Sequence, residues 1–324
     1  MSANTLRSLE ICAGAGGQAL GLEMAGFDPV MLVDNDKNAC DTLRKNRPQW
    51  RVVETDLREF VADEHEGVLD VDLLSCGVPS APFSVAGSQD GTEDGRDLLK
   101  PAIYLARGVR PRAIMIESTP TLLTAPKFSA AREFVLGKLR KLGYEVDWQV
   151  LNAEDFGVPQ TRKSAILIAM KSADFDRFVW PTGQEMAPTV GQALRRSMAS
   201  RGWRQADEWA KMANRPAPTI VGGSKKHGGA DLGPTRTKRA WLELGVDGHG
   251  VGNDVPERDY EIHPELGRKG FPQLTTAQVA LLQGIPDSWT ITGRKTASYR
   301  QIAQCFPPPL AAAIGHRIAY ALGG

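Results

Sequence analysis

The sequence predicts an α/β fold built on a mostly parallel sheet with helices on both faces. Over the first 170 residues, short apolar runs alternate with amphipathic stretches, which is typical of successive βαβ units. A glycine-rich turn at residues 13–17 joins the first apolar run to the first amphipathic stretch. A Rossmann-like fold places its ligand-binding loop at this point of the chain.

Seven strands are predicted, at residues 8–12, 29–34, 51–53, 71–75, 113–117, 145–151 and 165–170. Helices are expected between several of them, at residues 17–25, 37–46, 98–108 and 130–142. From about residue 175 to 270 the chain is rich in Gly, Pro, Lys, Arg and Trp and shows little periodicity. Regular patterning returns at 275–283 and in a closing helix at 310–322. We therefore expect one domain from residues 1–175 and 275–324 and a small irregular domain from 176–274, with the last helix packing back onto the first domain.

The overall charge excludes two classes of protein. Thirty-nine Lys and Arg balance 38 Asp and Glu, for a net charge of +1 among 324 residues. A histone-like polycation and an acidic-tail protein are excluded, whereas a local basic patch for nucleic acid is not.

The chain carries no sign of a membrane, a secretion signal or a metal site. It has no run of 18 apolar residues and no signal-peptide pattern, so a cytoplasmic protein is expected. The four cysteines, Cys12, Cys40, Cys76 and Cys305, lack paired spacing. We therefore predict neither disulfides nor a metal site.

The glycine-rich turn and the acidic residues after it predict a cofactor site. Gly14 and Gly16 allow a tight turn and close approach of a ligand, and Asp34 ends the next strand, where its carboxylate can bind ribose hydroxyls. The third glycine of the GxGxxG pattern is replaced by Ala19, so a plain strand–helix turn is the alternative. Asp56 is placed either to reach an adenine amino group or to cap the turn that follows it.

Six ordered motifs carry a resemblance to a known family. They are AGAGG at 13–17, GVPSAPFSVAG at 77–87, IEST at 116–119, GVPQTR at 157–162, LQGIPD at 282–287 and YRQI at 299–302. In order and spacing, over nearly the whole chain, they resemble the DNA cytosine-5 methyltransferases. The resemblance implies a Rossmann-like catalytic domain that uses S-adenosyl-L-methionine and leaves S-adenosyl-L-homocysteine. It also implies double-stranded DNA with a flipped-out cytosine, and a target-recognition segment between the fourth and fifth motifs.

Four motifs depart from the family pattern at the catalytic site. Ser80, natural or engineered, stands where the family has its nucleophilic cysteine, and Ser118 replaces the Asn of Glu-Asn-Val. Ser164 replaces the second Arg of Gln-x-Arg-x-Arg, and Gln304 replaces the Asn of Gly-Asn-Ala. These departures indicate a pocket with different chemistry, or with none.

The departures favour methyl transfer to N4 of cytosine over transfer to C5. Methylation at C5 needs a thiolate that adds to C6, and a serine hydroxyl is far less acidic and needs a dedicated base. Transfer to N4 needs only groups that orient the amino group. A Ser-Ala-Pro-Phe segment, which contains Ser80, Pro82 and Phe83, is similar to the short signature of amino-methyltransferases. By this similarity, Ser80 would accept a hydrogen bond from the amino group and Phe83 would stack on the base. The alternative is that this segment is a remnant of the family's own Cys-x-Pro-Phe-Ser.

Two further catalytic candidates come from the resemblance. Glu117 would contact the N3 and amino edge of cytosine, although a lone Glu after a strand is otherwise a cap or an ion-pair partner. Arg162 would hold the base carbonyl or a phosphate with its planar guanidinium. The full set of cofactor positions is Cys12, Gly14, Gly16, Asp34, Asp56, Gly77 and Gln304.

The recognition segment is predicted to bind DNA through phosphates. Residues 195–270 hold 14 Lys and Arg against 10 Asp and Glu, a net charge of +4. The candidates are Lys225, Lys226, Arg236 and Lys238, with a solvated surface loop as the alternative for any one of them. Residues 84–99, with three glycines, are expected to form a lid. Trp203, Trp209 and Trp241 are expected to pack rather than to wedge between bases.

Three functions remain open from the sequence. The leading one is a cytosine-N4 DNA methyltransferase, and the second is a C5 enzyme whose cysteine has been replaced. The third is a catalytically silent DNA-binding regulator on the same scaffold, which the retained cofactor loop disfavours. A monomer is expected, with a cognate restriction endonuclease as an expected partner.

Overall fold

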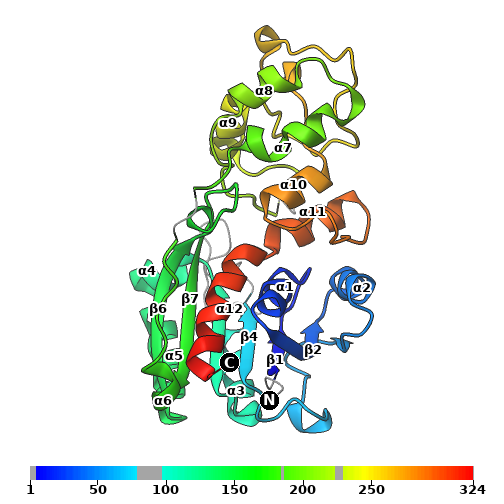
Figure 1. Ribbon diagram of the computed structural model, residues 1–324. Coiled ribbons are helices and arrows are strands. Elements are labelled where there is room, and N and C mark those ends of the chain that lie inside the picture. The colour runs from blue at the N-terminus through cyan, green and yellow to red at the C-terminus, as the bar shows by residue number, and fades with distance from the viewer. Residues whose placement is uncertain (1–4, 79–96, 184–185, 223–228, 324) are drawn as a thin grey trace. The chain divides into compact units, whose positions relative to one another are not determined.

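The computed structural model describes residues 5–78, 97–183, 186–222 and 229–323 (Figure 1). Several predicted site residues lie outside these ranges: Ser80, Pro82, Phe83, Lys225 and Lys226. Most of the expected lid, residues 84–96, also lies outside the described residues.

A seven-stranded sheet forms the centre of the first part of the chain, with strand order β3-β2-β1-β4-β5-β7-β6. The strands are β1 (Leu6–Ile11), β2 (Phe27–Asp34), β3 (Val52–Glu54), β4 (Leu73–Gly77), β5 (Ala113–Ser118), β6 (Tyr144–Asn152) and β7 (Lys163–Lys171). Strands β1 to β5 pair in parallel, and β7 runs antiparallel to β5. All seven predicted strands are present, so the α/β Rossmann-like fold predicted from the sequence is confirmed.

The helices between the strands also match the sequence pattern closely. They are α1 (Gly17–Met24), α2 (Lys37–Asn46), α3 (Leu99–Val109), α4 (Pro120–Thr124), α5 (Ser129–Lys141) and α6 (Ser172–Phe175). Helix α2 begins where the Asp36 carboxylate accepts hydrogen bonds from two backbone N–H groups, an N-cap that fixes its first turn. The closing helix α12 (Pro308–Leu322) packs against the end of α1, since a Cβ at Gly315 would lie 2.7 Å from the Cβ of Ala25. The last helix therefore packs back onto the first unit, as expected.

The described chain divides into two compact units. The first unit holds residues 1–151, 163–182 and 310–324, and the second holds 152–162 and 183–309. Residues 275–309 thus group with the second unit, whereas the sequence pattern assigns them to the domain with the sheet. A buried glutamine pair helps to explain this grouping, because Gln160 Nε2 donates to Gln283 Oε1 at 2.7 Å and Gln283 in turn donates to the Cys305 carbonyl. That the second unit recognises DNA remains a prediction.

Apart from α10 (Thr276–Leu282), which lies in the patterned stretch expected at 275–283, the second unit contains more regular structure than its sequence suggested. Its helices are α7 (Val190–Met198), α8 (Ala206–Met212), α9 (Thr235–Glu243), α10 (Thr276–Leu282) and α11 (Lys295–Gln304). Helix α7 begins with a reciprocal capping box between Thr189 and Gln192, a local signal that does not depend on hydrophobic periodicity. Helices of seven to ten residues span too few turns to establish a clear period.

The tryptophans of this unit form its core, as predicted. Trp209 and Trp241 are completely buried, and Trp203 is 3% exposed. The Trp209 indole donates to the Gly245 carbonyl at 2.9 Å, which satisfies its polar group inside the core.

Candidate functional site

The glycine loop follows the carboxyl end of β1 and has the backbone conformation of a ligand-binding turn. Cys12, Gly14 and Gly16 all have positive φ, at 54°, 54° and 83°. This conformation is rare for a residue with a Cβ, so Cys12 is held in it by its surroundings. The loop lies at the carboxyl edge of the parallel strands, where open α/β sheets bind their ligands.

Asp34 supports this loop directly from the end of β2. Its carboxylate accepts the Gly14 N–H at 2.7 Å and the Asp36 N–H at 2.8 Å. Burial raises the pKa of Asp34, and the backbone hydrogen bonds oppose that rise. Each carboxylate oxygen has a second lone pair for a ligand hydroxyl, so the predicted ribose contact is compatible with the observed geometry.

Asp56 acts in the described structure as a turn cap. Its carboxylate accepts the Arg58 N–H at 2.9 Å and pairs with the Arg58 guanidinium at 3.1 Å. This is the second of the two roles proposed from the sequence, and the adenine contact stays a prediction.

Glu10 is a site candidate that sequence reasoning missed. It lies on β1, is 1% exposed, and receives a hydrogen bond from the Ser75 hydroxyl at 3.2 Å. Among the described residues, its Oε1 has no partner with hydrogen-bond geometry, although the Ala19 backbone N–H lies near enough to oppose the rise in the pKa of this carboxyl, and the buried side-chain amide of Gln18 has no partner. The sequence does carry a signal for this residue, because Glu10 lies between Leu9 and Ile11 in an otherwise apolar strand. An unpaired buried acid raises the free energy of the folded state unless a ligand binds it.

These groups fit S-adenosyl-L-methionine. The two unsatisfied polar side chains flank the glycine loop in sequence, one on β1 and one on α1, and the ligand has ammonium, carboxylate and ribose groups to offer them. Gly77, another predicted cofactor position, ends β4; a Cβ there would lie 3.4 Å from the Cys12 carbonyl oxygen, an ordinary contact, so its role stays a prediction.

The buried Glu10 carboxyl should make stability depend on pH. Burial raises its pKa from 4.5 to about 8. The folded state therefore holds a proton that the unfolded state releases, so this stabilisation is present below pH 4.5 and is lost as pH rises to about 8. Each unit of pKa difference corresponds to about 1.36 kcal/mol.

We expect Glu10→Gln to remove this dependence and to raise the free energy of unfolding above pH 8 relative to the parent. Urea unfolding between pH 4.5 and about 9 measures the difference, with the exposed Glu59→Gln as the control. Parallel pH profiles for the parent and Glu10→Gln would show that the carboxyl does not titrate on unfolding.

Glu117 lies on β5 with its carboxylate held in place by a neighbour. Its Oε1 accepts the Ser164 hydroxyl at 2.8 Å, and Ser164 on β7 is 2% exposed. The sequence marks Ser164 only as the site of a missing Arg, whereas the structure makes it the partner of Glu117. The adjacent Ser118 hydroxyl is buried and has no hydrogen-bond partner among the described residues. A neutral donor thus orients the carboxylate where the family pattern places a cation.

Three cysteines are buried and do not replace the missing nucleophile. Burial raises the pKa of the Cys40 thiol to about 12. A hydrogen bond with Cys12, together with burial, raises the pKa of Cys76 well above its usual value. Cys305 is 5% exposed, and its thiol contacts the Phe306 carbonyl at 3.5 Å. A nucleophilic cysteine needs an accessible thiolate, which these three do not provide.

Arg162 and Gln304 both belong to the second unit. The Arg162 guanidinium donates to the Ile220 carbonyl at 3.2 Å and to the Ala303 carbonyl at 3.1 Å. It therefore joins three separate segments of that unit, a structural role that the sequence did not predict. Gln304 is the last residue of α11 and is exposed. Their contacts with base and cofactor stay predictions.

The predicted DNA contacts are only partly described. Lys238 forms an ion pair with Asp231 at 3.0 Å, and both side chains are less than a fifth exposed. Because Asp231 neutralises the Lys238 charge within the unit, Lys238 is less available to a phosphate. Arg236, by contrast, is exposed on the first turn of α9. Arg236 therefore remains the better candidate of the two.

The described residues contain neither a metal-binding cluster nor a membrane-spanning helix. No group of three or more His, Cys, Asp or Glu side chains is arranged to hold a metal ion within the described ranges. No described helix has the length and apolar character needed to cross a bilayer.

Comparisons with solved structures agree with the fold. An Entamoeba histolytica methyltransferase, EhMeth, superposes with a TM-score of 0.70 at 14% identity and covers 99% of both chains. The S. pombe Dnmt2 methyltransferase superposes with a TM-score of 0.65 at 15% identity and covers 98% of this chain and 99% of its own. At this level of identity, the likeness concerns the fold.

Comparisons of sequence identify the family. Type II methyltransferase M.NaeI of Lentzea aerocolonigenes is 49% identical over 98% of this chain and 76% of its own length. Type II methyltransferase M.NgoMIV of Neisseria gonorrhoeae is 42% identical over 97% of both chains. The family of C-5 cytosine-specific DNA methylases matches residues 6–320. This match, with relatives at 49% and 42% identity, places the chain in the C-5 cytosine-specific DNA methylase family.

Proposed function

We propose that this protein transfers a methyl group from S-adenosyl-L-methionine to N4 of a cytosine flipped out of duplex DNA, without a covalent intermediate. The observation that carries the proposal is the hydrogen bond from Ser164 to Glu117 at 2.8 Å. It supplies an oriented carboxylate without the second Arg of the family pattern. Ser80 stands at the position of the nucleophile, so the site lacks both parts of the thiolate machinery.

The cofactor would be held by the loop and the acids around it. Asp34 would accept the ribose hydroxyls, while the turn at Gly14 and Gly16 would let the ligand approach the backbone. Glu10 and Gln18 would receive its amino-acid end. When bound, the cofactor supplies an electrophilic methyl group.

The side chains around the base would orient the amino group for direct transfer. Glu117 would accept a hydrogen bond from one amino N–H, and this contact would direct the nitrogen lone pair out of the ring plane towards the methyl group. Ser80, outside the described residues, would accept a hydrogen bond from the other N–H. As the N–C bond forms and the S–C bond of the cofactor breaks, the nitrogen would lose one proton to the Glu117 carboxylate. Phe83, also outside the described residues, would stack on the base. Base stacking and hydrogen bonding of this kind hold a flipped base in position.

Two other functions are each favoured by a specific observation. The family match favours C5 methylation, because the family is named for that atom. The departures at Ser80, Ser118, Ser164 and Gln304 favour a catalytically silent DNA-binding protein. The buried Glu10 and Gln18 support the enzymatic proposals, because they leave unsatisfied polar groups that a cofactor would satisfy.

The relatives suggest a biological setting. M.NaeI and M.NgoMIV are both named type II methyltransferases, the modification partners of restriction endonucleases. We infer that this chain acts as a cytoplasmic monomer on double-stranded DNA and protects sites that a cognate endonuclease would cut.

Nucleoside analysis tests the proposal. DNA incubated with protein and cofactor is digested, and chromatography with mass spectrometry separates 4-methylcytosine from 5-methylcytosine. We expect 4-methylcytosine, and Ser80→Cys should not produce 5-methylcytosine at an appreciable rate, because Ser118 and Ser164 leave a thiolate without its supporting groups. Formation of 5-methylcytosine would establish the C5 alternative, and the absence of any methylated product would favour the silent one.

A further inference from the structure

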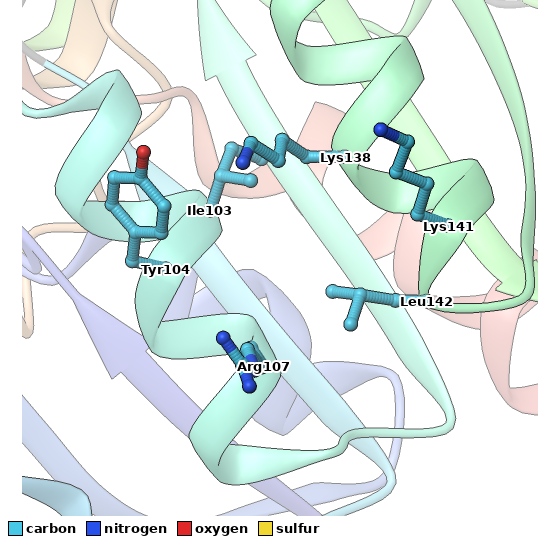
Figure 2. Close-up of a pocket in the computed structure, with 6 residues that line it drawn as sticks. All are labelled: Ile103, Tyr104, Arg107, Lys138, Lys141 and Leu142. Carbon is cyan, nitrogen blue, oxygen red and sulfur yellow. The ribbon is translucent and has the colours of Figure 1, made fainter.

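A groove on the first unit lies between α3 and α5. It encloses about 230 Å³ and is lined by Ile103, Tyr104 and Arg107 on α3 and by Lys138, Lys141 and Leu142 at the end of α5. Figure 2 shows the Lys138 amine directed across the groove towards Ile103 and Tyr104. We call this feature the α3–α5 groove.

The groove carries positive charge that the described structure does not compensate. Arg107, Lys138 and Lys141 are exposed, and none of them forms an ion pair with another described residue. Elsewhere in both units many arginines are paired with acids, among them Arg47 with Glu23, Arg110 with Asp70 and Arg201 with Glu257. In a chain with a net charge of +1, an uncompensated cluster marks a surface suited to an anion.

Aromatic rings are interleaved with these cations. Tyr104 is 55% exposed, and its ring meets that of Phe134 edge-on at 6.0 Å. Lys138 Nζ lies 5.5 Å from the Tyr104 ring centroid, and Lys100 Nζ lies 5.9 Å from that of Phe134. These contacts orient both ammonium groups along the surface.

The groove is separate from the cofactor loop. Helix α3 ends near the start of β4, because the Asp70 N–H donates to the Val109 carbonyl at 2.7 Å just before that strand begins. The glycine loop, by contrast, follows the carboxyl end of β1. Arg107 therefore lies towards the amino edge of the sheet, at the opposite edge from the cofactor loop.

We propose that the α3–α5 groove binds the phosphate backbone of a DNA duplex segment that does not enter the active site. This proposal rests on the proposed function only in taking DNA as the chain's polyanionic partner. Lys, Arg and Tyr are typical donors to phosphate oxygens. Lys138 and Lys141 lie three residues apart on one helix face, with their Cβ atoms about 5–6 Å apart, and can contact the same stretch of backbone. Lysine binds phosphate oxygens as a point charge, so the two lysines suit a phosphate backbone; an acidic protein segment is the alternative occupant that the test below distinguishes.

The test counts duplexes bound per chain and measures their salt dependence. A labelled duplex of about 14 base pairs is titrated against Lys138→Ala/Lys141→Ala and the parent, without cofactor, from about 50 to 200 mM salt. We expect the parent to bind two duplexes and the variant one. If the variant retains weak binding of the second duplex, its log–log salt slope should be shallower by about 0.9 for each lysine–phosphate pair removed.

A charge-matched control separates the groove from a general effect of charge. Lys37→Ala/Lys45→Ala removes two exposed lysines from α2 of the same unit and should retain both binding events. The proposal is overturned if the groove variant binds the second duplex as the parent does, or if both variants fail to bind it. If the parent binds only one duplex but binds labelled polyglutamate, and the groove variant loses the polyglutamate, an acidic protein segment is the occupant and the proposal is overturned. Because no methyl transfer is measured, a failure of the N4 proposal leaves this result unaffected.

Discussion

Glu117→Ala should lower the rate of methyl transfer by about 10²–10³-fold, the usual cost of losing one oriented group that acts in a transition state. The carboxylate lies on a buried strand and is already oriented by Ser164, so it needs no reorganisation when the base enters. Single-turnover kinetics under saturating DNA measures the rate. Binding of a duplex with 2-aminopurine at the target would remain, because the other groups that hold the base persist.

Two substitutions at Ser164 distinguish the effect of its hydrogen bond to Glu117 from the effect of its side-chain volume. Ser164→Ala removes the hydroxyl that donates to Glu117, whereas Ser164→Thr keeps it. We expect Ser164→Ala to reduce the rate by about tenfold or more through kcat rather than KM, since a hydrogen bond to a charged group contributes about 1.5–3 kcal/mol. Ser164→Thr should restore most of the rate. Equal rates for the parent and both variants would show that the hydrogen bond has no part in positioning Glu117.

Asp34→Ala should weaken cofactor binding by about 10- to 150-fold, which corresponds to about 1.5–3 kcal/mol for a charge-assisted hydrogen bond. The loss has two physical sources. The carboxylate is the proposed ribose ligand, and it also fixes the glycine loop through the Gly14 N–H. Isothermal titration calorimetry with S-adenosyl-L-homocysteine measures the affinity.

The matched control is Asp41→Ala. It removes an acid of the same charge from α2, where Asp41 pairs with the neighbouring exposed Lys37 and Arg44. Its affinity for the cofactor should equal that of the parent. If Asp34→Ala also binds the cofactor as the parent does, Asp34 is not part of the cofactor site.

The sheet and its helices were predictable because each depends on a local pattern. The buried strand at 165–170 appears in the sequence as a continuous apolar run, and the helix at 37–46 has an acidic cap and an amphipathic face. Helices α7, α8, α9 and α11 were missed because they are short and the core of their unit depends on long-range tryptophan packing. Helix α10 coincides with the patterned stretch expected at 275–283. The domain boundary predicted near residue 275 differs from the boundary in the structure, because the buried pair of Gln160 and Gln283 joins segments that are 123 residues apart.

The candidate site shows the same division between local and long-range information. The glycine loop and Asp34 follow from spacing along the chain, and the structure brings them within hydrogen-bonding distance. The Ser164–Glu117 hydrogen bond depends on the register between β5 and β7, where Glu117 pairs with Ile166. No sequence periodicity specifies that register. Glu10 could be recognised as an acid within an apolar strand, but its burial depends on neighbours across the sheet.

The proposed methyl transfer to N4 without a covalent intermediate is tested most directly with duplex DNA in which the target cytosine carries fluorine at C5. An enzyme that adds a nucleophile to C6 is trapped on this base, because fluorine cannot leave as a proton after methyl transfer. A site that transfers to N4 forms no bond to C6. The proposed mechanism therefore predicts that the fluorinated base is methylated and released, with no protein–DNA adduct on a denaturing gel. An adduct through Ser80 that survives denaturation would contradict it.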